Sequence, residues 1–246
     1  MNFTRYRNTV KLKVIKLLKP FLVIFLPSDL ITGWKSRDRI SAINYLENVV
    51  KPSSSLIGSY VDIKSFKSIL EVGSNSGPNL IRYAQIFPEI KFTGLDLNKD
   101  AVKLGNENAQ RSRLPNLRFI QVDLTDSNFS RSFPEKEDLV FSFATLMYIH
   151  PFYIKRVLRD LLEISNQYLV LIEQHDEGFL TKCFPFGIPS GFEASFKRDY
   201  KKLVIGELAK LGRRFDSIDI FEVDQRIWAP GGGSARIIRV RLRARP

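Results

Sequence analysis

The chain has 246 residues, of which 44% are hydrophobic and 26% are charged. This composition excludes disordered, collagen-like and low-complexity chains. A single cysteine excludes an intrachain disulfide, so we expect a cytoplasmic protein. The net charge of +12 lies in two segments, 1–28 and 226–246, which each carry six basic and no acidic residues. The neutral stretch between them does not favour nucleic acid as a partner.

Residues 1–27 combine their lysines and arginines with apolar residues at helical spacing. The longest apolar run, 21–26, lies between two prolines and is too short for a spanning helix, which needs about 20 residues. The pattern is typical of a segment that lies on an anionic membrane surface, and we expect peripheral association with the inner face of the membrane. A helix that packs on the domain, with solvated lysines, is the alternative. We expect residues 1–55 to form an N-terminal helical extension and residues 56–246 to form the main domain.

Short apolar runs alternate with helical patterns along the main domain. The runs predict parallel strands at 68–72, 91–95, 117–122, 138–143 and 168–172, and the helical patterns predict helices at 79–87, 101–111 and 154–165. Two further runs, 215–223 and 234–242, are joined by a Pro-Gly-Gly-Gly turn and predict an antiparallel hairpin. The expected fold is therefore α/β, a doubly wound, mostly parallel seven-stranded sheet with a C-terminal antiparallel hairpin.

The last predicted strand carries arginines at alternate positions, from Arg239 to Arg245. Period two places them on one face of the strand. Edge protection by charge and a phosphate-rich partner both explain such a stripe, and the sequence leaves the two open.

Polar and glycine residues follow three of the predicted strands in an order that indicates a nucleotide site. Ligands of such sheets bind at the carboxyl ends of the strands. The first strand runs into Glu71-Val-Gly73-Ser-Asn75-Ser-Gly77, in which glycines allow a close backbone approach. The second ends at Asp96, where a carboxylate can accept both ribose hydroxyls, and the third at Asp123, which can accept from an adenine amino group. The dinucleotide fingerprint fails, because it requires glycine where Asn75 and Pro78 stand.

This constellation resembles the class I S-adenosylmethionine-dependent methyltransferases. The resemblance covers about residues 65–175, and it implies S-adenosyl-L-methionine as cofactor and no metal. The implied cofactor-binding residues are Glu71, Gly73, Asn75, Gly77, Asp96, Leu97, Asp123, Leu124 and Phe143. A narrower similarity, carried by segments 146–151, 168–173 and 196–200, is to methylases of bacterial surface-sugar pathways, including pseudaminic-acid biosynthesis.

Methyl transfer to a hydroxyl benefits from a general base, and the chain has only two histidines. His150 follows the fourth strand and His175 follows the fifth, so both belong on the ligand side of the sheet. We favour His175, because strand-end loops carry chemistry more often than helix interiors do. A packed His150 and a loop His175 without catalytic role are the alternatives.

The acceptor is expected to be a small molecule or a glycan. The long aromatic connection 174–195 is typical of a lid or binding loop. Arg198 and Tyr200, just after it, are the candidate substrate-binding residues, with Arg198 suited to an anionic group. The alternatives are an RNA or protein methyltransferase recruited through the basic termini, and a cofactor-binding module without turnover.

Overall fold

The computed structural model describes residues 33–48, 56–127, 129–133, 136–184, 187–190, 195–224, 227 and 235–243. The predicted membrane segment 1–27 and most of the turn between the last two strands lie outside the described residues. Among the described residues, no helix is both long and apolar enough to cross a membrane.

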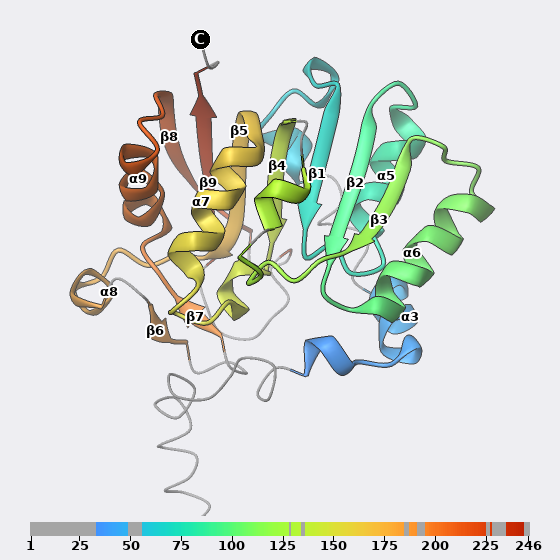
Figure 1. Ribbon diagram of the computed structural model, residues 1–246, viewed down its shortest axis with the longest axis horizontal. Helices are drawn as coiled ribbons and strands as arrows, with labels where there is room; N and C mark the ends of the chain where they lie inside the picture. The colour runs from blue at the N-terminus through green and yellow to red at the C-terminus, as the bar shows by residue number, and fades with distance from the viewer. Residues whose placement is uncertain are drawn as a thin grey trace, which may run out of the picture.

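The central feature is a seven-stranded sheet in the order β3-β2-β1-β4-β5-β9-β8, and Figure 1 shows its twist. The first five strands of this order run parallel, and β9 runs antiparallel to both of its neighbours, β5 and β8. The sequence predicted the five parallel strands and the antiparallel β8–β9 pair. The strands are β1 (Ser68–Val72), β2 (Lys91–Asp96), β3 (Leu117–Gln121), β4 (Glu137–Phe143), β5 (Ser165–Gln174), β8 (Phe215–Glu222) and β9 (Ala235–Leu242). Every residue of β4 is buried, as expected for a central strand covered on both faces.

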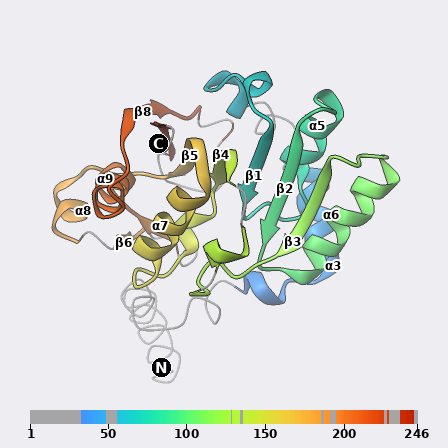
Figure 2. The same cartoon turned by 45° about the horizontal axis from the view of Figure 1, so that its top comes forward.

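Helices cover both faces of the sheet and enclose two apolar cores. The helices are α3 (Arg39–Asn48), α5 (Pro78–Ile86), α6 (Lys99–Arg111), α7 (Ile154–Ile164), α8 (Phe179–Cys183) and α9 (Tyr200–Lys210). Side chains of α5 and α6 pack with Ile69 and Phe141 in one core, whereas those of α7 and α9 pack with Leu70 and Val140 in the other. Neighbouring strand residues thus alternate between the cores. Figures 1 and 2 show α7 and α9 side by side on one face.

The predicted boundaries are correct to within about two residues for most of these elements. The prediction missed three elements between the fifth strand and β8. These are α8, α9 and a two-stranded hairpin of β6 (Ile188–Pro189) and β7 (Phe196–Lys197). The hairpin and α8 lie toward the edge of the sheet at which the parallel strands end, in the lower part of Figure 1.

The arginine stripe of β9 lies next to acidic residues of β8, which is the edge strand. Arg239 pairs with Asp219 at 2.9 Å, and Arg236 pairs with Glu222 at 3.0 Å. Arg243 pairs with Asp216 at 2.6 Å. Arg241 lies 3.7 Å from the same Asp216. Cross-strand ion pairs between β8 and β9 therefore neutralise most of the arginine charge of β9 that the structure describes.

Candidate cofactor site

A cavity opens at the carboxyl ends of β1, β2, β3 and β4. It encloses about 830 Å³ of space, a figure that includes open solvent at its mouth. Seven of the nine residues that the sequence predicted as cofactor-binding line it: Gly73, Asn75, Asp96, Leu97, Asp123, Leu124 and Phe143. The other lining residues are Trp34, Leu95, Val122, Thr125, Ala144, Thr145, Tyr148 and Ile149. The cavity thus collects residues from four strand ends at the switch point of the sheet.

The turn after β1 forms one wall, and its backbone explains its residue types. Gly73, Asn75 and Gly77 all have positive φ, at 69°, 50° and 81°. Asparagine tolerates this region because its short polar side chain bonds locally, and here its Oδ1 accepts from the backbone N–H of Ser76 at 2.7 Å. A Cβ at Gly73 would lie 2.1 Å from Thr145 Oγ1. The close approach of the turn to the loop after β4 therefore requires glycine there.

Asp96 joins this turn to the end of β2. Its Oδ2 accepts from the backbone N–H of Asn75 at 2.7 Å, and its Oδ1 accepts from that of Asn98 at 2.8 Å. Burial raises the pKa of the Asp96 carboxyl above its usual range, although these backbone N–H groups oppose the shift. Each carboxylate oxygen can accept a second hydrogen bond, so the group can still receive ligand hydroxyls.

Asp123 begins the segment that follows β3. Its Oδ1 accepts from both the backbone N–H and the hydroxyl of Thr125, at 2.8 and 2.6 Å. These bonds fix the direction of the carboxyl group at the cavity wall. The neighbouring Val122 and Leu124 add apolar surface to the same wall, which suits a flat ring better than a charged group.

The loop after β4 forms the opposite wall, and a buried glutamate holds it. Glu173 is fully buried, and its Oε1 accepts from the backbone N–H groups of Thr145 and Leu146 at 3.1 and 2.9 Å. Ala144 has φ 51°, which is uncommon for a residue with a side chain. The 3-10 helix η5 (Leu146–Tyr148) follows this residue. The Glu173 carboxylate also accepts from the hydroxyl of Ser142 in β4 at 2.9 Å, so it joins this loop to the sheet.

The segment before the main domain supplies Trp34, which the sequence reading did not place at the site. The backbone carbonyls of Trp34 and Arg37 accept from Asn98 Nδ2 at 2.9 and 2.8 Å, which ties this segment to the end of β2. The Trp34 ring lies 5.4 Å from that of Tyr148. Its Nε1 is buried and has no hydrogen-bond partner among the described residues. A buried N–H donor in a cavity wall is an apt partner for a bound ligand.

Glu71 and Gly77 belong to the predicted motif but not to the lining of the cavity. Glu71 accepts from Asn79 Nδ2 at 2.7 Å, and its Oε2 is buried without a hydrogen-bond partner among the described residues. Burial raises the pKa of the Glu71 carboxyl to about 8. Gly77 caps α5 with φ 81°, and a Cβ there would lie 2.0 Å from the ring of Phe119. Both residues therefore join the turn to α5 and to the sheet, away from the lining of the cavity.

Neither histidine is among the described residues that line the cavity. His175 Nδ1 accepts from the backbone N–H of Tyr200 at 3.2 Å, so the ring helps to cap α9. His150 follows Ile149, which does line the cavity, and its Nδ1 accepts from the backbone N–H of Phe152 at 3.2 Å. The general-base role of either residue stays a prediction.

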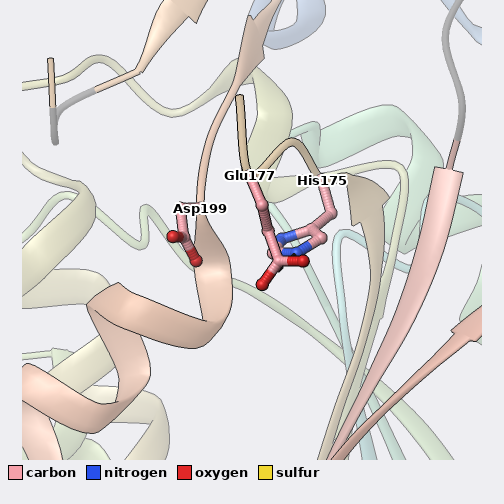
Figure 3. Close-up of side chains that lie close together, drawn as sticks. All are labelled: His175, Glu177 and Asp199. Atoms are coloured by element: carbon pink, nitrogen blue, oxygen red, sulfur yellow. Dashed lines mark ion pairs between the residues drawn. The ribbon is translucent and has the colours of Figure 1, made fainter. Parts of the chain in front are cut away.

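His175 also lies near two carboxylates, those of Glu177 and Asp199 (Figure 3). One ligand atom from each of the three lies within 4.8 Å of the others. Burial lowers the pKa of His175, which favours the neutral ring. Because Nδ1 accepts a hydrogen bond, the neutral ring carries its proton on Nε2, which lies 3.9 Å from Glu177 Oε1. Nε2 is buried without a hydrogen-bond partner among the described residues, and a metal ion there would have to displace its proton.

Arg198 and Tyr200, the predicted substrate-binding residues, are both 0% exposed. Arg198 Nη1 donates to the carbonyl of Leu146 at 2.9 Å, and Nη2 donates to that of Ile149. The Tyr200 hydroxyl accepts from Arg198 Nη1 at 3.3 Å, and burial raises the pKa of Tyr200. Their role in substrate binding stays a prediction, and the structure gives both of them internal partners.

Comparison with known proteins agrees with this geometry. Residues 69–167 match the family described as a methyltransferase domain. A tRNA (guanine-N(7)-)-methyltransferase of Pediococcus pentosaceus is 33% identical over 60 residues, which cover 23% of this chain and 28% of that protein. The matches to curated relatives span only 10% to 38% of those proteins' lengths.

Solved structures share the fold over most of the chain. Magnesium protoporphyrin IX methyltransferase of Synechocystis, solved with S-adenosylmethionine, superposes with a TM-score of 0.60 at 11% identity, over 89% of this chain and 98% of that one. An O-methyltransferase family protein of Burkholderia thailandensis gives 0.60 at 12% identity, over 86% and 62%. The fold and the cavity agree with this match: residues 69–167 are similar to a methyltransferase domain, and the chain shares the fold of these solved methyltransferases.

Proposed function

We propose that the chain uses S-adenosyl-L-methionine to methylate an oxygen atom of a small-molecule or glycan acceptor. The observation that carries the cofactor assignment is the common cavity of Gly73, Asn75, Asp96, Asp123 and Phe143, which four separate strands bring together. The solved neighbours include structures with bound S-adenosylmethionine and S-adenosylhomocysteine.

The residues present fit this cofactor. Asp96 can accept from ribose hydroxyls, and the apolar wall beside Asp123 suits a flat ring such as adenine. Glycine at position 73 keeps the backbone accessible where a Cβ would meet Thr145. The buried Nε1 of Trp34 offers an N–H donor.

Gly73, Asp96 and Asp123 would hold the cofactor, which would supply a methyl group on a sulfonium. The acceptor oxygen would take that methyl group as S-adenosylhomocysteine leaves, and the hydroxyl proton would pass to a general base, the role predicted for His175 or His150. The residues of the cavity contribute chiefly by holding the reactants in line, which alone can lower a barrier by several kcal/mol. Among the described lining residues, Asp96 and Asp123 have carboxylates, and Thr125, Thr145 and Tyr148 have hydroxyls.

A small-molecule or glycan acceptor is favoured over RNA by the charges that the structure describes. Four arginines in and just after β9 face three acidic residues of β8, so most of this positive charge is neutralised within the sheet. RNA or protein methylation remains the second candidate, because the tRNA methyltransferase of Pediococcus pentosaceus shares a 60-residue match. The narrower resemblance to sugar methylases places a glycan among the first acceptors to test.

The test is transfer of a labelled methyl group from S-adenosylmethionine into a cell extract that is then separated into small molecules, lipids, polysaccharides, RNA and protein. We expect label in the small-molecule, lipid or polysaccharide fraction, in a form stable to the conditions that cleave methyl esters. Label confined to RNA or protein would contradict the proposed acceptor. An absence of label in every fraction, with cofactor bound, would favour a binding module.

A further inference from the structure

Two buried charged residues hold the loop that forms one wall of the cofactor cavity. One precedes and the other follows the long connection 174–195 in the chain. Glu173 lies at the end of β5, and Arg198 lies between β7 and α9. Both are 0% exposed. A buried charge is costly unless it is paired or hydrogen-bonded, so both residues require a structural reason.

Glu173 binds the start of η5. Its Oε1 accepts from the Ser142 hydroxyl and from the backbone N–H groups of Thr145 and Leu146, at 2.9–3.1 Å. Its Oε2 accepts from the backbone N–H of Met147 at 3.0 Å. One carboxylate therefore holds three consecutive N–H groups that a short helix leaves without partners.

Arg198 binds the other end of the same helix. Its Nη1 donates to the carbonyl of Leu146 at 2.9 Å, and its Nη2 donates to the carbonyl of Ile149. The Phe196 ring lies 4.9 Å from the guanidinium carbon. The carboxylate thus holds the N–H end of η5, and the guanidinium holds its C=O end.

The loop between these two groups lines the cavity through Ala144, Thr145, Tyr148 and Ile149. We propose that Glu173 and Arg198 are positioning residues that act together as a clamp on residues 144–149, so that the segment bearing Arg198 controls the shape of the cofactor cavity. The identity of the ligand, S-adenosylmethionine, rests on the proposed function. The clamp also predicts a change in the ligand-free protein, because Tyr148 lies against Trp34 and should move when the clamp is broken.

Arg213 provides a matched control. It is 9% exposed, and its guanidinium also donates to two backbone carbonyls, those of Leu162 and Asn166. The carbonyl of Leu162 lies in the last turn of α7 and that of Asn166 at the start of β5, whereas Glu173 lies near the end of β5. Arg213→Met removes the same chemistry from the opposite end of the strand.

The experiment compares Arg198→Met, Arg198→Lys and Arg213→Met by thermal denaturation and by titration with S-adenosylhomocysteine. We expect Arg198→Met to weaken binding at least tenfold, because the carbonyls of Leu146 and Ile149 lose the guanidinium that joins them to β7 and α9. Arg198→Lys should be intermediate, since one ammonium keeps the charge but not the planar fork. Arg213→Met should lose thermal stability and keep its affinity within twofold of the wild type.

The chain has two tryptophans, Trp34 and Trp228. The emission of Trp34 alone is therefore measured in a Trp228→Phe background, in the absence of any ligand. Displacement of Tyr148 should shift the emission of Trp34 in Arg198→Met and in Glu173→Gln, and not in Arg213→Met. Glu173→Gln keeps one oxygen that can accept from the backbone N–H groups of the loop. Its NH₂ group replaces the second oxygen and cannot accept, so at least one of these N–H groups loses its acceptor. If Arg198→Met does not fold, Gly187→Ala carries the test, since a Cβ there would lie 2.7 Å from Arg198 Cγ.

The outcomes separate the two proposals. A folded wild type that does not bind S-adenosylhomocysteine contradicts the proposed function, while the emission shift still tests the clamp. Wild-type affinity and emission in folded Arg198→Met would overturn the clamp alone. Equal losses of affinity in Arg198→Met and Arg213→Met would also overturn it, because the effect would then follow general destabilisation.

Discussion

The buried carboxyl of Glu71 makes the stability of the protein depend on pH in a way that one substitution should remove. Burial raises its pKa from 4.5 to about 8, with Asn79 opposing the shift through a hydrogen bond. The folded state therefore binds a proton that the unfolded chain loses above about pH 4.5. The free energy of unfolding should fall as pH rises from about 4.5 to 8, and this contribution should level off above 8.

The difference of about 3.5 pKa units corresponds to at most roughly 5 kcal/mol, at about 1.36 kcal/mol per unit. Glu71→Gln keeps an oxygen to accept from Asn79 and cannot ionise. Other titrating groups are shared by both proteins, so their contributions largely cancel in the comparison. Between pH 5.5 and pH 8.5, we expect the stability of Glu71→Gln relative to the wild type to increase by about 3 kcal/mol, because only the roughly 2.5 units from pH 5.5 to the folded pKa of about 8 contribute.

Urea denaturation followed by circular dichroism at the two pH values measures this change. Cofactor affinity at neutral pH should stay within about threefold of the wild type, because Glu71 is not among the described residues that line the cavity. A stability difference that does not change with pH would refute the reasoning that burial holds this carboxyl protonated.

Three further predictions follow from the cavity and its surroundings. Gly73→Ala should weaken S-adenosylhomocysteine binding more than tenfold in calorimetry, because its Cβ would lie 2.1 Å from Thr145 Oγ1. Gly206→Ala is the control: nothing lies within 4 Å of a Cβ at this position in α9, so the free energy of unfolding should rise by about 0.5–1 kcal/mol. Trp34→Phe should weaken the same ligand about three- to tenfold by loss of one N–H donor, and unchanged affinity would remove that donor from the site. The full chain should sediment with anionic vesicles, less so at high salt, whereas a chain without residues 1–27 should stay in solution and keep cofactor binding; sedimentation of both would refute the membrane role of that segment.

The sequence predicted the sheet well because its signals are local. Apolar runs such as 138–143 and 168–172 can form only buried strands once helical patterns lie between them. The glycine-rich turn and Asp96 follow their strands directly, so parallel strand order alone places them at one edge. These residues could be placed without knowledge of any long-range contact.

The rest of the site depends on contacts between residues far apart in the chain. Trp34 reaches the cavity because Asn98 binds its backbone carbonyl 64 residues away. Arg198 was expected to face an acceptor, but its guanidinium donates to carbonyls 49 and 52 residues away. A sequence shows that a cation is present and does not show which buried carbonyls need it.

The arginines of β9 give a third example of this limit. Their alternation is visible in the sequence, but their acidic partners on β8 become visible only once the register of the two strands is known. Arg239 lies opposite Asp219 in that register, and Arg236 lies opposite Glu222. The register thus shows cross-strand ion pairs that the alternation of arginines alone could not reveal, and a phosphate-rich partner stays an untested alternative.

Calorimetric titration of the wild type and Asp96→Ala with S-adenosylhomocysteine tests the central claim most directly. The account predicts binding by the wild type and a loss of about 1.5–3 kcal/mol in Asp96→Ala, since a charged acceptor of ribose hydroxyls is removed. This loss corresponds to about ten- to hundredfold weaker affinity, and NAD should bind more weakly than S-adenosylhomocysteine to the wild type. Equal affinity in folded wild type and Asp96→Ala, or tighter binding of NAD, would contradict the account.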